Sequence, residues 1–189
     1  MSDIAVEKQA ARRAAMAVRK RAHRAARGAG NAAAEHVLAW LKTQPEVQVI
    51  AGYMPINTEI DILPLMRALH RRGYQVCVPV IMGKAMPLKF RAWTPESPMV
   101  SGDFGALVPE TGGWLRPDLL LCPMLAFDAT GQRMGYGGGF YDRSLAELAP
   151  VRALGFAYSA QQVERLPCEA TDMPLDGVAT EAGIVLKLG

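Results

Sequence analysis

A run of ten residues, "DLLLCPMLAF" at positions 118–127, is apolar after its first residue. A strand covered on one face alternates apolar and polar side chains, whereas a strand covered on both faces is apolar throughout. The run therefore predicts a strand inside a sheet that has helices packed on both of its faces. This is the arrangement of an α/β domain with a largely parallel sheet.

Helix and strand patterns alternate along the rest of the chain. Helices are expected at about 5–27, 32–43, 58–73 and 140–149, and strands at 47–55, 74–81, 87–93, 151–158 and 181–188. Gly28 and Gly30 are expected to end the first helix. Residues 101–117 are rich in turn-forming residues and predict a long surface loop. We therefore expect residues 1–189 to form a single three-layer α/β domain that begins with a basic helix.

Positive charge is concentrated at the start of the chain. The 189 residues have a formal net charge of only +3, yet residues 1–30 hold eight Lys or Arg against two acidic residues. Such a segment is typical of transit peptides and of nucleic-acid-binding helices. Asp3 and Glu7 argue against a transit peptide, and residues 1–39 contain no aromatic side chain to stack on bases. We therefore expect a cytoplasmic protein without a nucleic-acid partner.

Membrane and metal-centred functions are disfavoured by the composition. No stretch of about 18 apolar residues is present, so no membrane partner is expected. Cys77, Cys122 and Cys168 lie far apart in the sequence, and the three histidines show no metal-binding spacing. We expect the cysteines to be buried free thiols.

Five glycines lie within "GQRMGYGGGFYDRSL", residues 131–145, between the apolar strand and the next predicted helix. Glycines leave the backbone open to close approach. In parallel sheets ligands bind at the carboxyl ends of strands, where backbone amides and a helix N-terminus together attract an anion. The spacing suits a phosphate cradle, although the loop by itself is equally compatible with a plain glycine-rich turn.

The loop matches neither of two common nucleotide-binding motifs. No Gly-Lys-Ser/Thr follows it, and Phe140 stands where a dinucleotide fingerprint has its last glycine. Its charged neighbours nevertheless favour phosphate. Arg133 and Arg143 flank the glycines and offer guanidinium groups to phosphate oxygens. Asp142 offers a carboxylate to a magnesium ion carried by those phosphates.

The segment "FDATGQRMGYGGGFYDRSL" resembles the signature of the 5-formyltetrahydrofolate cyclo-ligase family, also called 5,10-methenyltetrahydrofolate synthetases. Further resemblances follow in order along nearly the whole chain. They are "KQAAR" on the first helix, "YMPINTEID", "PDLLLCPMLAFD" and the C-terminal "GFAYSAQQVERLPCEATDMPLDGVATE". The ordered set argues against a chance match.

The resemblance implies an ATP-dependent ligase of one-carbon metabolism, which acts as a monomer on two small molecules. ATP phosphorylates the formyl oxygen of 5-formyltetrahydrofolate, N10 of the folate attacks the activated carbon, and phosphate leaves. The products are 5,10-methenyltetrahydrofolate, ADP and phosphate. Catalysis then rests on positioning and on neutralising phosphate charge. The resemblance also implies magnesium as the cofactor, and a sheet like that of sugar-phosphate isomerases and CoA transferases.

The resemblance further implies a set of ATP-binding residues. They are Lys8, Arg12, Arg133, Met134, Gly135, Tyr136, Gly137, Gly138, Gly139, Phe140 and Tyr141. Lys8 and Arg12 are four apart, so a helix places both on one face. Without the resemblance, this pair would be interpreted as part of a solvated basic face. Arg133 and Tyr141 are the residues that we expect to act in catalysis.

Folate and metal contacts follow from the same resemblance. The expected substrate-binding residues are Met54, Glu59, Tyr136, Gly137, Gly138, Gly139 and Phe140. Tyr136, Phe140 and Tyr141 are expected to form the wall between nucleotide and folate. Asp142 and Asp172 are the expected magnesium ligands, although Asp172 alone also suits an ordinary turn.

Two other functions stay open on the sequence. A sugar-phosphate isomerase or CoA-transferase-like enzyme would need a catalytic Glu or another base near its substrate, and it would not need Lys8 and Arg12. A non-enzymatic nucleic-acid-binding protein would use the basic helix and would bind RNA with strong salt dependence.

Overall fold

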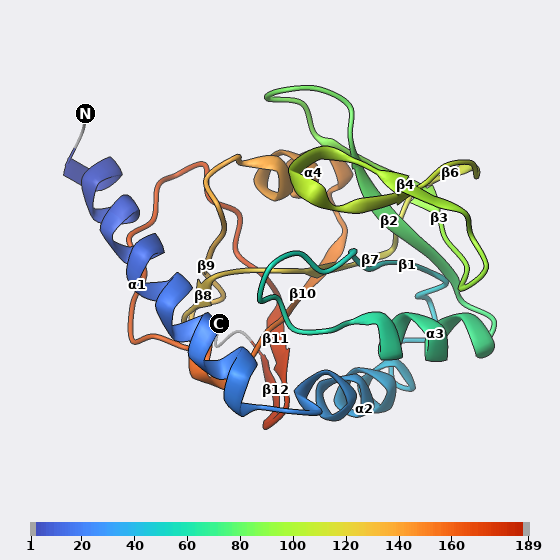
Figure 1. Cartoon of the computed structure of the whole chain (residues 1–189), viewed down its shortest axis with the longest axis horizontal. Helices are drawn as coiled ribbons and strands as arrows, with labels where there is room; N and C mark the ends of the chain where they lie inside the picture. The colour runs from blue at the N-terminus through green and yellow to red at the C-terminus, as the bar shows by residue number, and fades with distance from the viewer. Residues whose placement is uncertain (1–2, 187–189) are drawn as a thin grey trace.

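An eight-stranded sheet forms the centre of the computed structural model, which describes residues 3–186 (Figure 1). Its five central strands are parallel and lie in the order β11 (Gly177–Thr180), β10 (Arg152–Phe156), β7 (Leu119–Cys122), β1 (Val49–Ala51) and β2 (Gln75–Ile81). The edge strands are antiparallel, with β12 (Gly183–Leu186) beside β11, and β3 (Leu88–Ala92) and β6 (Trp114–Leu115) beyond β2. The α/β class and the largely parallel sheet predicted from the sequence are confirmed.

Helices cover both faces of this sheet. α2 (Ala29–Leu41) and α3 (Leu63–Arg71) pack on one face, and α4 (Phe140–Leu148) packs on the other (Figure 1). The three layers enclose two hydrophobic cores, one on each side of the strands. Burial of apolar surface in these cores is the main force that holds the layers together.

The position of β7 between the two cores explains why its residues are all apolar. Leu119 and Leu121 belong to the core under α2 and α3, whereas Leu120 and Cys122 belong to the core under α4. All four side chains are buried, because successive residues of a strand point to opposite faces. The predicted strand at 118–127 is nevertheless broken after Cys122.

The break coincides with Pro123, which has no N–H to donate to a sheet. Beyond it, β8 (Ala126–Phe127) pairs with β9 (Arg133–Met134) in a short hairpin. This hairpin leads the chain away from the sheet and into the glycine-rich segment that precedes α4.

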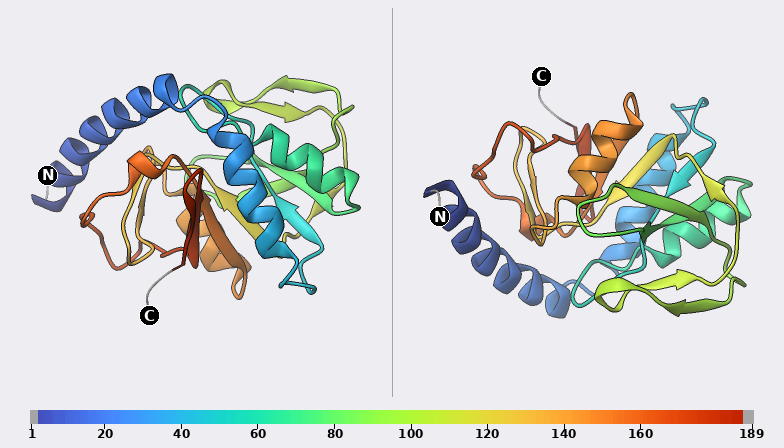
Figure 2. Two further views of the ribbon diagram at one scale, coloured as in Figure 1. Left: turned by 90° about the horizontal axis from the view of Figure 1, so that it is seen from below. Right: turned by 90° about the horizontal axis from the view of Figure 1, so that it is seen from above.

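The basic helix α1 (Asp3–Ala25) belongs to neither helical layer. In both views of Figure 2 it curves along the side of the protein where the segments that follow β7 and β10 lie. The small side chains of Ala15 and Ala22 are buried on its inner side, so the helix approaches these segments closely. It ends before Gly28, whose φ is 79°. Within residues 3–186, no helix has the length and the apolar character needed to span a membrane.

Gly30 does not end the first helix as predicted, because it lies inside α2. A side chain at this position would overlap the backbone oxygen of Asp61. Gly30 therefore permits close packing between α2 and the segment that precedes α3. The same segment explains why the helix predicted at 58–73 begins only at Leu63: Oδ1 of Asp61 accepts a hydrogen bond from the N–H of Leu63 at 3.0 Å and turns the chain there.

The loop predicted at 101–117 contains short strands. β4 (Met99–Ser101) and β5 (Leu107–Pro109) form a hairpin with the 3-10 turn η1 (Asp103–Gly105) at its tip, and β6 extends the main sheet. Strands of two or three residues show too little alternation to stand out among Gly and Pro. β11 was not predicted at all. β12 lies within the predicted strand at 181–188, of which 187–188 are outside the described residues.

The strand order creates a switch point between β1 and β7. After β1 the chain passes through α3 to β2 on one side, and after β7 it passes through α4 to β10 on the other. The segments that leave the carboxyl ends of these two neighbouring strands therefore diverge. In α/β sheets, ligands bind in the crevice at such a point.

Candidate active site

The glycine loop, residues 135–139, connects β9 to α4 on the β7 side of the switch point. Gly137 and Gly139 have φ values of 97° and 65°, which other residues rarely adopt. A Cβ at Gly137 would lie 3.1 Å from Cζ of Arg12, and one at Gly139 would lie 2.7 Å from Nη1 of Arg143. The positive φ values favour glycine at both positions, and the two guanidinium groups lie close against the loop.

The backbone N–H groups of the glycine loop are available to a ligand. No described residue accepts a hydrogen bond from the N–H groups of residues 136–139. The loop leads directly into α4, whose N-cap, Gly139, provides no side-chain cap. Unpaired amides beside a helix N-terminus attract anions. The loop thus has the unpaired amides and the adjoining helix N-terminus that the sequence prediction of a phosphate cradle requires.

Helix α1 brings two basic side chains to this region. Nε of Arg12 donates a hydrogen bond to the oxygen of Gly135 at 3.2 Å. One turn earlier, Nζ of Lys8 lies 2.7 Å from Oε2 of Glu169 and 2.6 Å from Oδ2 of Asp172. Lys8 is only 9% exposed. The predicted pair on the first helix therefore faces inward and is not a solvated basic face.

The ion pair between Lys8 and Asp172 changes the acidity of both groups. Burial disfavours the charged form of Lys8, but hydrogen bonds to Asp172 and Glu169 outweigh it and raise the pKa of Lys8. Burial likewise disfavours ionised Asp172, but hydrogen bonds from Lys8 and from the N–H of Glu169 lower the pKa of Asp172. Both groups are charged at neutral pH.

Arg133 lies in a second ion pair beside the first. Its Nη2 donates to Oδ1 of Asp142 at 2.9 Å, and its Nη1 donates to the oxygen of Met173. The same Oδ1 accepts a hydrogen bond from the N–H of Met173 at 3.0 Å. Because Met173 follows Asp172, both predicted metal ligands and Arg133 are close neighbours. The sequence separation of these residues gave no hint of the pairing.

Glu59 lies in the segment that follows β1, on the other side of the switch point. It is 6% exposed, its Oε2 accepts a hydrogen bond from the N–H of Ile56 at 2.9 Å, and its Oε1 lies 3.7 Å from Nη1 of Arg19. Burial raises the pKa of Glu59, although the hydrogen bond from Ile56 and the charge of Arg19 oppose the rise. Met54, in the same segment, is partly buried at the edge of the core under α2 and α3.

Three aromatic side chains lie near the glycine loop. Tyr136 is 44% exposed, and its hydroxyl accepts hydrogen bonds from Arg19 and from Nδ2 of Asn57, the latter at 3.5 Å. Phe140 and Tyr141 open α4 and pack against the core beneath it. Burial raises the pKa of Tyr141 well above its ordinary value. Its phenol therefore stays neutral at physiological pH and can donate a hydrogen bond.

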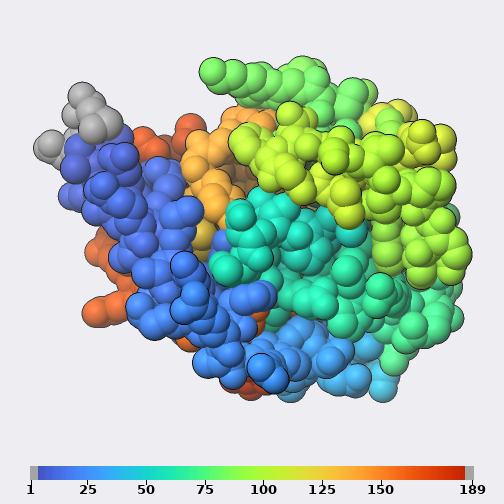
Figure 3. Space-filling model, in the orientation of Figure 1, coloured from blue at the N-terminus to red at the C-terminus, as the bar shows by residue number. Residues whose placement is uncertain are grey.

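The tip of the β4–β5 hairpin reaches the same region. Phe104 is 74% exposed, and its ring meets the ring of Phe140 edge-on, with centroids 6.2 Å apart. Its φ of 54° is rare for a bulky residue. In Figure 3 the yellow-green hairpin lies beside the orange surface of the glycine-loop region and α4, with blue α1 on the other side. α1 and the hairpin therefore border the candidate site.

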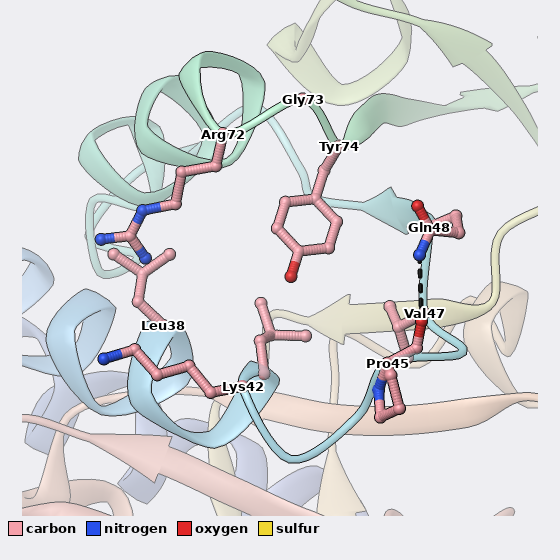
Figure 4. A pocket seen from close by; sticks show the side chains of 9 residues that line it. Leu38, Lys42, Pro45, Val47, Gln48, Arg72, Gly73 and Tyr74 are labelled. Atoms are coloured by element: carbon pink, nitrogen blue, oxygen red, sulfur yellow. Dashed lines mark hydrogen bonds between the residues drawn. The ribbon is translucent and has the colours of Figure 1, made fainter.

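A pocket of about 450 Å³ lies elsewhere, at the amino ends of β1 and β2. Lys42, Arg72 and Tyr74 line it together with apolar side chains that include Leu38 and Val47 (Figure 4). The glycine loop lies beyond the carboxyl end of β7, whereas the pocket lies at the amino ends of the strands. The two are therefore at opposite ends of the parallel strands. It shares no residue with the candidate site.

A sequence profile of the 5-formyltetrahydrofolate cyclo-ligase family matches residues 4–181. The chain belongs to this family. The 5-formyltetrahydrofolate cyclo-ligase of Escherichia coli K12 is 34% identical over an alignment 155 residues long, which covers 76% of this chain and 85% of that protein. The cyclo-ligase of Haemophilus influenzae is 36% identical over an alignment 143 residues long, which covers 70% of this chain and 75% of that protein.

Two solved structures have the same fold as this cyclo-ligase family member. The NMR structure of Aquifex aeolicus 5,10-methenyltetrahydrofolate synthetase has a TM-score of 0.73 and 29% identity, and covers 95% of this chain and 92% of that chain. The Mycoplasma pneumoniae synthetase has a TM-score of 0.68, with 95% and 99% covered. At 21% identity, the second likeness shows the fold alone.

Cyclo-ligases use ATP as a co-substrate, and the resemblance implies a magnesium ion beside its phosphates. Asp142 and Asp172 each use one carboxylate oxygen for the contacts described above, and the other oxygen accepts no hydrogen bond from residues 3–186. Magnesium is commonly bound by one or two carboxylates plus substrate phosphates. The two side chains fit such an ion, although the described residues contain no cluster of three possible metal-binding side chains.

The cyclo-ligase signature predicted most residues that meet here, but not all. Arg19 and Phe104 also lie here and were not among the predicted residues. Arg19 had a signal, because it follows Arg12 by seven residues and so lies two helical turns along the same face. Phe104 had none, because only the folded hairpin brings it to Phe140.

Arg143 supports the loop backbone, because its Nη2 donates to the oxygen of Gly138 at 2.8 Å and its Nε to the oxygen of Met86 at 3.3 Å. Its expected contact with phosphate stays a prediction. One expectation requires correction. Cys168 was expected to be buried, but it is exposed in the loop that holds Glu169, whereas Cys77 and Cys122 are buried free thiols as expected.

Proposed function

We propose that this protein converts 5-formyltetrahydrofolate and ATP to 5,10-methenyltetrahydrofolate, ADP and phosphate. The observation that carries the proposal is the meeting of three parts at one switch point in a member of the cyclo-ligase family. These parts are the glycine loop, the inward face of α1 with Lys8 and Arg12, and the buried carboxylate of Glu59.

The glycine loop and α1 form the nucleotide side of the proposed site. The N–H groups of residues 136–139 and the N-terminus of α4 bind phosphate oxygens. Lys8, Arg12 and Arg133 supply positive charge around them. Met134 and Gly135 bring the chain into this loop, and Gly138 keeps it narrow, because a Cβ there would lie 2.7 Å from the ring of Phe140.

Asp142 and Asp172 are the residues that would hold magnesium. When bound, such an ion neutralises phosphate charge and orients the phosphoryl group. Asp142 would keep one oxygen on Arg133, and Asp172 would keep one oxygen on Lys8. The other oxygen of each carboxylate would be available to such an ion.

Glu59, Met54 and Tyr136 form the folate side. Glu59 presents a fixed carboxylate to hydrogen-bond donors of the folate, and Met54 adds an adaptable apolar contact. Tyr136, Phe140 and Tyr141 lie between this side and the phosphates, and so form the wall that brings the two substrates together. Nothing in this arrangement requires a protein side chain to form a covalent bond.

The chemistry then follows from positioning and charge. The formyl oxygen is a poor leaving group until a phosphoryl group is attached to it, after which N10 attacks the carbon and phosphate departs. Arg133 neutralises charge that develops on the transferred phosphoryl group. Tyr141, kept neutral by its burial, donates a hydrogen bond and does not serve as a base.

The test is the absorbance of methenyltetrahydrofolate with purified protein, 5-formyltetrahydrofolate and magnesium, with and without ATP. A rise that requires ATP supports the proposal. A matched reaction with Arg71→Ala, which changes an exposed arginine of α3, controls for a general effect of removing a guanidinium group. No rise from folded wild-type protein would contradict the proposed reaction.

The two alternative functions have less support. The basic helix already has a use within the chain, because Lys8, Arg12 and Arg19 all make inward contacts. A nucleic-acid-binding role is therefore not needed to explain its charge. The likeness of the sheet to sugar-phosphate isomerases and CoA transferases stays a prediction. An isomerase-type enzyme would have no need for the docked Lys8 and Arg12.

Three expectations from the sequence remain part of this proposal. We expect residues 1–189 to form one domain, the enzyme to be a monomer, and its compartment to be the cytoplasm. The reducing environment of the cytoplasm suits the free thiols of Cys77 and Cys122, whose burial raises the pKa of each to about 12. Sedimentation of the purified protein with and without ATP tests the monomer.

A further inference from the structure

Arg19 is a buried arginine on α1 that contacts three separate parts of the candidate site. It is 2% exposed. Its Nε donates to Oγ1 of Thr58 at 3.2 Å, and its Nη1 donates to the oxygen of Met124 at 3.2 Å. Its Nη2 donates to the hydroxyl of Tyr136. One side chain thus joins the segment after β1, the segment after β7 and the glycine loop.

Among the described residues, Arg19 forms an ion pair with one carboxylate, that of Glu59. Nη1 of Arg19 lies 3.7 Å from Oε1 of Glu59, and both side chains are almost completely buried, at 2% and 5% exposed. A buried charge without a partner is costly, so each of these two groups needs the other. Oε2 of Glu59 is held separately by the N–H of Ile56. The two oxygens of Glu59 therefore have different neighbours, which fixes the plane of the carboxylate.

Arg19 also belongs to the same inward face of α1 as the nucleotide-side residues. Seven residues, or two turns, separate it from Arg12, which contacts Gly135. Tyr136 follows Gly135 directly, and the guanidinium of Arg19 lies 5.3 Å from the centroid of its ring. Helix α1 therefore contacts two adjacent residues of the glycine loop. Arg12 contacts Gly135, and Arg19 contacts Tyr136.

We propose that Arg19 is the positioning residue of the folate subsite, which holds the carboxylate of Glu59 and the ring of Tyr136 in their binding orientation from α1. This proposal rests on the proposed function, because it assigns 5-formyltetrahydrofolate to Glu59. Arg19 does not touch the reacting atoms in this assignment. Its effect on the reaction passes through Glu59 and Tyr136.

The first experiment compares Arg19→Met with wild type in binding and in turnover. We expect Arg19→Met to weaken the affinity for 5-formyltetrahydrofolate about ten-fold or more, measured by calorimetry without ATP, and to raise the KM for the folate similarly. The KM for ATP is expected to change by less than about three-fold, because Lys8 and Arg12 remain. Arg13→Met is the matched control, since Arg13 is exposed on the same helix.

The pH profile separates positioning from general loss of structure. Within residues 3–186, the charged or titratable side chains that are electrostatically coupled to Glu59 are Arg19 from α1, Tyr53 from the segment after β1 and Tyr141 from α4. Of these, only Arg19 favours the ionised carboxylate. Arg19→Met should therefore raise the pKa of Glu59 and move the acid limb of kcat/KM for the folate to higher pH. Glu59→Gln in the Arg19→Met background should abolish that movement.

Arg19→Lys keeps the proposal testable if Arg19→Met fails to fold. The ammonium group of the lysine retains the charge beside Glu59. It lacks the several N–H donors of the planar guanidinium that reach Thr58, Met124 and Tyr136 together. We expect an acid limb close to that of wild type, with a folate affinity between those of wild type and Arg19→Met. Thermal unfolding of each variant identifies those that are folded.

The outcomes separate this proposal from the proposed function. If wild type binds 5-formyltetrahydrofolate and folded Arg19 variants bind it within two-fold of wild type, Arg19 has no positioning role. An unchanged acid limb in a folded Arg19→Met would equally overturn the link to Glu59. If wild type neither binds nor converts the folate, the proposed function fails and the assignment of Arg19 fails with it.

Discussion

Nη2 of Arg133 lies 2.9 Å from Oδ1 of Asp142, so the guanidinium expected to bind phosphate is paired with a carboxylate expected to bind magnesium. Met173 holds both partners, because its oxygen accepts from Arg133 and its N–H donates to Asp142. Each charge thus has a partner of opposite sign. A bound phosphate with its cation would supply new partners for both.

This relationship predicts that Arg133 and Asp142 are both needed for turnover. We expect Arg133→Ala and Asp142→Ala each to lower kcat by about 100-fold or more, because each removes a charge that acts on the transferred phosphoryl group. Arg71→Ala, an exposed arginine on α3, is expected to leave kcat unchanged. Turnover within three-fold of wild type in both site variants, at saturating ATP and magnesium, would contradict the site assignment.

Lys8 provides a test of the nucleotide side alone. We expect Lys8→Ala to raise the apparent KM for ATP about ten-fold, since it removes a buried ammonium group from the proposed nucleotide side of the site. The KM for 5-formyltetrahydrofolate should change little. Lys20→Ala, on the exposed side of the same helix, serves as the control. An effect on folate affinity without one on ATP would assign Lys8 to the other subsite.

Asp172 predicts a dependence of stability on pH. Its pKa is lower in the folded protein than in the unfolded chain. Its contribution to stability is therefore fully present above the unfolded pKa and is lost as the pH falls through the folded pKa. Asp172→Asn should reduce the free energy of unfolding by about 1–3 kcal/mol at pH 6. The difference in the free energy of unfolding between wild type and Asp172→Asn should disappear as the pH falls below the range in which carboxylates titrate.

Urea unfolding between pH 3 and pH 7 measures this difference directly. Glu164→Gln is the matched control, because Glu164 is exposed and forms no ion pair with a described residue. A constant difference between wild type and Asp172→Asn down to the lowest pH would mean that the ion pair with Lys8 is not the cause of the destabilisation.

The helices and four of the five central strands were predictable, because each lies in a segment with a helical, strand-like or wholly apolar pattern. The apolar run of β7 satisfies two cores at once, and so it indicated the whole three-layer arrangement. The fifth central strand, β11, was not found, because "GVAT" is a short run of small residues without alternation. β6, with two residues, shows no pattern at all.

Local patterns in the sequence indicated the part of the candidate site that lies within one segment. They did not indicate which residues of distant segments pair with each other. The glycine loop and Asp142 lie within a single motif. By contrast, Lys8 meets Asp172 across 164 residues, and Arg19 meets Met124 across 105. Pairings of this kind arise from how α1 packs on the carboxyl ends of the strands, which no local pattern in the sequence describes.

Gly30 offers a test of the packing that positions the segment before α3. Alanine normally stabilises a helix interior by about 1 kcal/mol relative to glycine. At Gly30, however, the new methyl group would overlap the backbone oxygen of Asp61, so we expect Gly30→Ala to reduce the free energy of unfolding by about 1–3 kcal/mol. Asn31→Ala, at the exposed next position of α2, should change it by less than about 0.5 kcal/mol. Urea unfolding of both variants measures these two changes in the free energy of unfolding. A Gly30→Ala protein as stable as wild type would show that α2 tolerates a wider separation from this segment than the structure has.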